Sequence, residues 1–141
     1  MAAVVAGFRS ALGDAHPDTL GSINNLGALL KTQGRLDEAR PLYEEALAGS
    51  RSALGDVHPN TLTSIYNLAV LLRQLGDAAA AIPLFREELA GCRATLGADH
   101  TDTRGSLWNL VGLLQEQGAA QEAAQLQDYC ALNEFNAQNV R

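Results

Sequence analysis

A block of 42 residues occurs three times along the chain, beginning at Gly13, Gly55 and Gly97. The first two blocks agree at more than half of their positions, whereas the third diverges in its second half. Together with the residues that precede and follow them, the blocks account for all 141 positions, which leaves no stretch for a separate catalytic domain. A period of this length, with two helices in each unit, predicts a helical solenoid that presents a binding surface.

Each block carries the pattern of two helices joined by a glycine turn. In the first block, apolar residues recur at helical spacing on both sides of Gly34, at Ile23, Leu26, Leu29, Leu30 and then Leu36, Ala39, Leu42, Tyr43, Ala46, Leu47. The first helix is expected to begin near Pro17, because a missing backbone donor is harmless in the opening turn. Gly34, Gly76 and Gly118 are expected to adopt a left-handed conformation that ends the first helix of each block.

The repeat predicts one continuous domain with regular boundaries. Residues 1–12 are interpreted as the second helix of a truncated leading repeat, residues 13–54, 55–96 and 97–138 as three repeats, and residues 139–141 as a tail. The third repeat is predicted to end in a polar capping helix, because a terminal repeat turns one face to water. Small residues such as Gly27 should let the paired helices approach closely, and Tyr43 and Phe85 should fill the space between successive hairpins.

Composition narrows the class of protein further. With 47% hydrophobic and 18% charged residues, the chain can bury a core and is unlike a disordered segment. No apolar run is long enough for a membrane span, and the first residues do not form a secretory signal. The isolated Cys92 and Cys130 favour buried structural thiols in a reducing cytoplasm. A net charge of -6 argues against binding to nucleic acid or to an anionic membrane surface.

A known family shares this residue pattern. The series Ile23, Leu26, Gly27, Leu30, Gly34, Ala39, Tyr43, Ala46 resembles the tetratricopeptide repeat, and the longer period, with LGDxHPxTL, INNLGALL and EARPLYEEAL, resembles the kinesin light chain type. The resemblance implies an all-α fold, a right-handed superhelical solenoid of antiparallel helix hairpins with about three repeats and a leading half-repeat. It also implies a non-enzymatic scaffold that binds a partner peptide in a concave groove. A connection between cargo and a microtubule motor is implied more weakly, since the chain lacks a heptad region for pairing with a motor chain.

The first helices of the repeats supply the candidate binding residues. If Leu26 and its equivalents point into the packing, three amides at the preceding position turn toward the concave side, with three variable residues beside them and two cations six residues further on. The full set is Asn24, Asn25, Lys31, Tyr66, Asn67, Arg73, Trp108 and Asn109. A primary amide both donates and accepts hydrogen bonds, so a row of amides can hold the backbone of an extended peptide without reading its sequence. The two cations favour an acidic partner. The alternative is that each Asn holds neighbouring helices together, and Trp108 fits either an exposed anchor or a packed residue.

Histidines and acids invite an enzymatic interpretation, which the repeat argues against. His16, His58 and His100 stand one per block, too far apart to share a metal, and are better explained as caps of the helix starts. The acidic pairs Asp37/Glu38, Glu44/Glu45 and Glu87/Glu88 are adjacent in sequence, so they splay around a helix and suit a solvated outer face. No catalytic residues, metal site or cofactor are therefore predicted.

Two functions from different classes remain open. The first is an adaptor that binds a peptide of a partner protein in its groove. The second is a structural or regulatory array of a larger signalling protein, acting by self-association through Val4, Val5 and Phe8 of the N-terminal helix.

Overall fold

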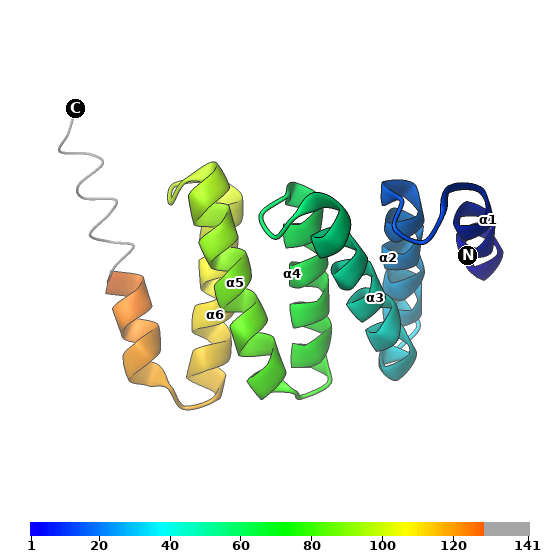
Figure 1. Cartoon of the computed structure of the whole chain (residues 1–141). Coiled ribbons are helices and arrows are strands. Elements are labelled where there is room, and N and C mark those ends of the chain that lie inside the picture. Colours follow the sequence, from blue (N-terminus) through cyan, green and yellow to red (C-terminus); the bar gives the residue numbers. More distant parts are fainter. Residues whose placement is uncertain (129–141) are drawn as a thin grey trace. The chain divides into compact units, whose positions relative to one another are not determined.

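The computed structural model describes residues 1–128, and within that range all regular secondary structure is helical. Two compact units, Met1–Asp77 and Ala78–Arg141, divide the chain, and each is described by itself. The first unit holds α1 (Ala2–Leu12), α2 (Pro17–Thr32), α3 (Leu36–Leu54) and α4 (Pro59–Gln74). The second holds α5 (Ala78–Leu96), α6 (Thr101–Glu116) and a helical stretch at residues 120–128 (Figure 1). The all-α repeat fold predicted from the sequence is confirmed.

A histidine caps the first helix of every block. His16 precedes α2, and its Nδ1 accepts a hydrogen bond of 3.1 Å from the backbone N–H of Asp18. The same bond recurs at His58 before α4 and at His100 before α6. Because Nδ1 accepts, it carries no proton, and one of the orphan donors of the helix start is satisfied. The predicted capping role of the three histidines is confirmed.

Glycines end the first helices as predicted. Gly34 has a φ of 77°, its N–H bonds Lys31 O at 3.0 Å, and the Arg35 N–H bonds Leu30 O at 2.9 Å. This pair of bonds is the Schellman arrangement, in which a left-handed residue lets the chain turn while the last carbonyls stay satisfied. Positive φ angles also occur at Gly76 and Gly118, and at the glycines that open the blocks, Gly13, Gly55 and Gly97. Both turns of the repeat therefore use glycine, although only the turn after the first helix was predicted to need it.

In the first unit, α1 packs on α2, α2 on α3, and α3 on α4. The apolar cluster consists of Val5, Leu20, Ile23 and Ala46, with Leu26 and Leu42 against it. Tyr43 of α3 is buried against Gly27 of α2, where an added Cβ would lie 2.9 Å from the tyrosine ring. Gly27 is therefore required for the close approach of α2 and α3 that the sequence predicted. Arg9 fastens α1 through ion pairs with Asp14 at 2.9 Å and Glu45 of α3 at 2.6 Å.

The second unit corrects one prediction. Glu88, assigned from sequence to a solvated outer face, is only 7% exposed and lies on the side of α5 that packs against α6. Its neighbours are Cys92, whose Sγ lies 4.0 Å from Glu88 Oε1, and Ser106 of α6, whose Oγ lies 3.7 Å from Cys92 Sγ. The error arose because acidic residues were assumed to be exposed, although Glu88 is equivalent to the fully buried Ala46 of the first block.

Cys92 is buried, as predicted, and it is the one cysteine among residues 1–128. Burial raises the pKa of this thiol, so it remains protonated and behaves as a packing residue. Cys130, most of the predicted polar cap and the tail at residues 139–141 lie outside the described residues. No helix within residues 1–128 has both the length and the apolar character needed to cross a membrane.

Candidate functional site

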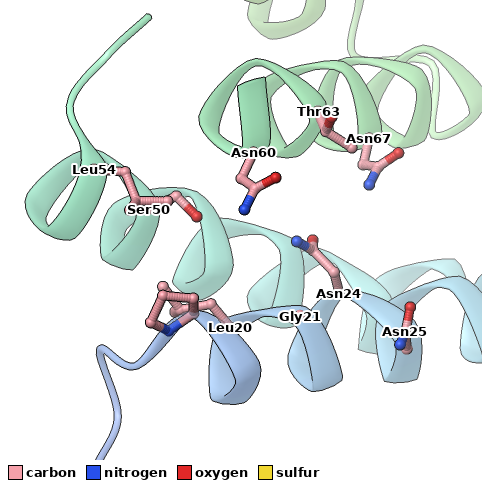
Figure 2. A pocket seen from close by; sticks show the side chains of 10 residues that line it. Leu20, Gly21, Asn24, Asn25, Ser50, Leu54, Asn60, Thr63 and Asn67 are labelled. Atoms are coloured by element: carbon pink, nitrogen blue, oxygen red, sulfur yellow. The ribbon is translucent and has the colours of Figure 1, made fainter. Parts of the chain in front are cut away.

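A pocket of about 280 Å³ opens in the first unit between the N-terminal halves of α2 and α4, with the end of α3 at its back. Its lining residues are Pro17, Leu20, Gly21, Asn24 and Asn25 of α2, Ser50 and Leu54 of α3, and Asn60, Thr63 and Asn67 of α4. Figure 2 shows the amides of α2 and α4 facing a common space. We call this pocket the amide groove.

The period of the α-helix places these residues on one face. Asn60, Thr63 and Asn67 are spaced i, i+3, i+7, so they form one stripe along α4. Gly21 and Asn25 occupy the equivalent positions of α2, one block earlier. The structure thus places Asn25 and Asn67 in the lining of one pocket, and the sequence predicted both to belong to a row of amides. Asn109, the third amide of the predicted row, is half-buried and belongs to the second unit.

Asn24 has a different role from its neighbour. Its Nδ2 donates a hydrogen bond of 3.1 Å to Ser64 Oγ of α4, which joins the two helices that form the groove. Its Oδ1 is buried and has no partner among the described residues. The alternative interpretation, in which an Asn holds neighbouring helices together, therefore describes Asn24. Asn25 is exposed and Asn67 is partly exposed, so their amides remain accessible.

The two predicted cations lie outside the groove. Lys31 and Arg73 do not line it, although both are partly exposed. The reason is geometric: six residues along an α-helix correspond to a rotation of about 600°, which points the side chain about 120° away from the starting direction.

The two predicted aromatic residues are both exposed. Tyr66 belongs to α4 but does not line the groove. Trp108, on α6 of the second unit, is 64% exposed, so it is a surface residue and not part of the core. This exposure agrees with the anchor interpretation of Trp108.

Sequence reasoning missed the polar residues Asn60 and Thr63. Both lie in the first half of α4, a region that the sequence analysis treated only as the helix start. A signal was present, since Asn60 and Thr63 precede Asn67 at helical spacing and repeat the positions of Asp18 and Gly21. Ser50 and Leu54 were also missed, because only the first helices were expected to supply binding residues.

The polar side chains that line the groove are all uncharged. They are amides and hydroxyls, which donate and accept hydrogen bonds but do not titrate near neutral pH. Among residues 1–128, no group of three or more His, Cys, Asp or Glu side chains is arranged to hold a metal ion. What this arrangement offers a ligand is hydrogen bonding and shape.

A family model described as tetratricopeptide repeat matches the chain at residues 2–52, 18–94 and 62–128. The chain belongs to the tetratricopeptide repeat family. This result confirms the family predicted from the sequence and supports a protein-interaction repeat scaffold, a type of fold that is typically non-enzymatic. No curated protein matches the chain.

Solved structures give the same result. A Podosopora anserina protein named for kinesin light chain and for nearly identical TPR-like repeats has a TM-score of 0.89, is 27% identical, and is matched over 96% of this chain and 64% of its own. A single-substitution variant of that protein has a TM-score of 0.78 at the same identity and coverage. BtubC (BKLC) from P. vanneervenii has a TM-score of 0.80 at 19% identity, over 93% of this chain and 52% of its own, and shows the shared fold. The chain thus spans about half to two thirds of the length of these relatives.

Proposed function

We propose that this chain is a non-enzymatic adaptor that binds an extended segment of a partner protein in the amide groove. The observation that carries the proposal is the convergence of the Asn25, Asn60 and Asn67 amides on one pocket. An extended peptide presents N–H and C=O groups alternately, and each amide side chain can satisfy either kind. The volume of about 280 Å³ lies at the lower limit of ligand pockets and suits a few peptide residues.

The groove is held in shape before a ligand arrives. The Asn24–Ser64 hydrogen bond joins α2 to α4, and His58 fixes the start of α4 on the other side. Because the walls are fixed, little conformational entropy is lost in them on binding, which favours affinity from a small contact area.

Substitution of the accessible amides tests the proposal. Peptides from a random phage-displayed library are selected on the full chain, and their affinities are measured by fluorescence anisotropy for wild type and variants. Asn67→Ala and Asn25→Ala are each expected to weaken binding about three- to tenfold, because a net hydrogen bond contributes about 0.5–1.5 kcal/mol. Gln74→Ala is the matched control, since Gln74 is an exposed amide at the end of α4 that does not line the groove. Equal binding by all four proteins would refute the proposal.

The neighbours named for kinesin light chain extend the proposal to cargo binding by an adaptor. A cytoplasmic location is part of the same proposal, in which Cys92 serves as a buried packing thiol. Trp108 would supply an aromatic contact in the second unit, because an exposed indole is a frequent hot spot of protein interfaces.

Self-association is a second candidate, favoured by the apolar surface of α1. Val4 and Leu12 of this helix and the preceding Met1 are each nearly half exposed, but Val5, which the sequence assigned to the same surface, is buried in the core and Phe8 is partly buried. Two copies that pair through α1 would remove the exposed side chains from water. Sedimentation velocity over a range of concentrations tests this, with Val4→Lys expected to abolish any dimer. Val57→Lys, at an exposed valine in the loop before α4, is the control and should leave the dimer intact. A monomer at every concentration would eliminate this candidate.

A further inference from the structure

We infer that the amide groove selects uncharged peptide segments and rejects acidic ones. This inference rests on the proposed function and specifies the chemistry of the partner at that site. It differs from the preference for an acidic partner that the sequence suggested, since Lys31 and Arg73 lie outside the groove.

The lining of the groove is the first argument. Every lining residue is uncharged, so the pocket offers hydrogen bonds but no cation. A carboxylate that enters such a pocket gives up part of its hydration and finds only neutral partners, which is unfavourable unless an opposite charge is near. A neutral side chain or a backbone segment loses much less hydration.

The surroundings of the groove are the second argument. Asp18 precedes Gly21 and Asn25 at spacings of three and seven residues, so it extends the lining stripe of α2, and its side chain is 66% exposed. Asp56, in the loop two residues beyond Leu54, is 70% exposed. The Asp18 carboxylate opposes the approach of a negatively charged segment, whereas the charge of Asp56 is offset by its ion pair with Arg51.

The cationic residues near the groove do not offset the negative charge of Asp18. Arg51 is the cation closest in sequence to the α3 wall, and its Nη1 pairs with Asp56 Oδ1 at 3.0 Å. Lys31 and Arg73 lie six residues beyond Asn25 and Asn67, a rise of about 9 Å along each helix and a rotation of about 120° away from the groove. Asp18 contacts His16, whose Nδ1 lies 3.9 Å from Asp18 Oδ2 and accepts the capping hydrogen bond, and its other sequence neighbours Pro17, Thr19 and Leu20 are neutral.

A selection from random peptides tests the inference. A random dodecapeptide library displayed on phage is selected on the full chain, and only peptides that lose binding to Asn25→Ala or Asn67→Ala are kept, since these require the groove. Their net charge is compared with that of the unselected library. Depletion of Asp and Glu among the groove-dependent peptides is the expected result.

A synthetic pair then measures the discrimination. The best neutral peptide and a version with one central Gln replaced by Glu are compared on wild type, Asp18→Asn and Asp37→Asn. The acidic version is expected to bind about threefold or more weakly, and the difference should shrink at high salt, because salt screens charges separated by more than about 10 Å at 0.1 M ionic strength. Asp18→Asn installs the residue that the second block carries as Asn60 and should reduce the difference. Asp37→Asn makes the same charge change at the opposite end of α3 and should not.

The outcomes separate the two proposals. Enrichment of acidic peptides that need Asn25 or Asn67, or tighter binding of the Glu version, would overturn this inference and leave the groove as a peptide site. A library without groove-dependent binders would overturn the proposed function, and this inference with it. Discrimination that persists unchanged in Asp18→Asn and at high salt would assign selectivity to the uncharged lining alone and refute the contribution of the Asp18 carboxylate.

Discussion

Replacement of Glu88 by methionine is expected to stabilise the second unit. Glu88 is 7% exposed on the face of α5 that packs on α6, and its Oε2 has no hydrogen-bond partner among the described residues. Methionine is unbranched and of similar length, so it can occupy the same space without a polar atom. The substitution removes an unsatisfied buried group and adds apolar contact.

The expected magnitude follows from the unpaired oxygen. A buried polar atom without a partner costs about 1–3 kcal/mol, and more when it is charged. The carboxylate interacts only weakly with the neighbouring thiol, since Cys92 Sγ lies 4.0 Å from Oε1. Ser106 keeps a bond of 2.9 Å to the backbone oxygen of Asp102. We therefore expect Glu88→Met to raise the free energy of unfolding at neutral pH by about 1–3 kcal/mol.

The effect depends on pH with a definite sign. Burial raises the pKa of the Glu88 carboxyl above its ordinary value of 4.5, and the negative charge of Asp102 on α6 raises it further, although a hydrogen bond from Ser106 opposes them. A raised pKa in the folded state means that folding favours the protonated form. Stability from this group is thus fully present below pH 4.5 and is lost as the pH rises through the folded pKa.

Urea unfolding monitored by circular dichroism, repeated from acid to neutral pH, measures the difference between wild type and variant. Glu88→Gln separates the effect of charge from that of polarity. It should remove the pH dependence that Glu88 gives to the free energy of unfolding, and it should keep the cost of a buried polar group. Asp99→Asn, an exposed carboxylate in the same unit, should change stability by less than about 0.5 kcal/mol. A Glu88→Met variant that is less stable than wild type at neutral pH would show that the interactions of the carboxylate with Ser106 and Cys92 outweigh the cost of its unpaired oxygen, and the reasoning would fail.

Substitutions at four further positions test the repeat architecture, all by thermal or urea unfolding. Thr61→Val removes a fully buried hydroxyl without a partner among the described residues and should be neutral or stabilising by about 1 kcal/mol; a loss above that would mean that the hydroxyl is bonded. His58→Ala removes the cap of α4 and should cost about 0.5–2 kcal/mol, whereas His58→Asn should recover most of it. Gly27→Ala should destabilise because its methyl group meets the Tyr43 ring at 2.9 Å. Gly105→Ala, in open space within α6, should instead stabilise by about 0.5–1 kcal/mol, and equal effects at the two glycines would contradict the packing.

Much of the fold could be predicted because the residues that begin and end each helix recur at the same position in all three blocks. A histidine precedes every first helix, at His16, His58 and His100. Recurrence at one position of the period indicates that each histidine has the same structural role. The glycine turns and the close approach of α2 and α3 at Gly27 followed from the same regularity, whereas Tyr43, expected between successive hairpins, packs against Gly27 within one hairpin. Glu88 could not be placed in this way, because its burial depends on tertiary packing and its equivalent in the first block is an alanine.

The candidate site was predicted only in part, for a related reason. Asn25 and Asn67 share a position in the period, so their common orientation could be inferred from it. The groove also uses Asn60, Ser50 and Leu54, which come together only when three helices are assembled. Residue spacing predicts which side chains share one face of a single helix. It does not predict which residues of the other helices lie opposite that face.

Residues at one position of the repeat make different contacts in different blocks. Asn24, Tyr66 and Trp108 are equivalent in sequence, yet Asn24 is partly buried in a bond to Ser64 while Trp108 is 64% exposed. The short amide of Asn24 reaches α4 and donates its hydrogen bond there, whereas the indole of Trp108 extends into solvent. A tryptophan side chain buries about 150–250 Å² when a partner covers it. The same backbone position thus stabilises the scaffold in the first unit and offers contact area in the second, which is why recognition by this array should change in kind from one unit to the other.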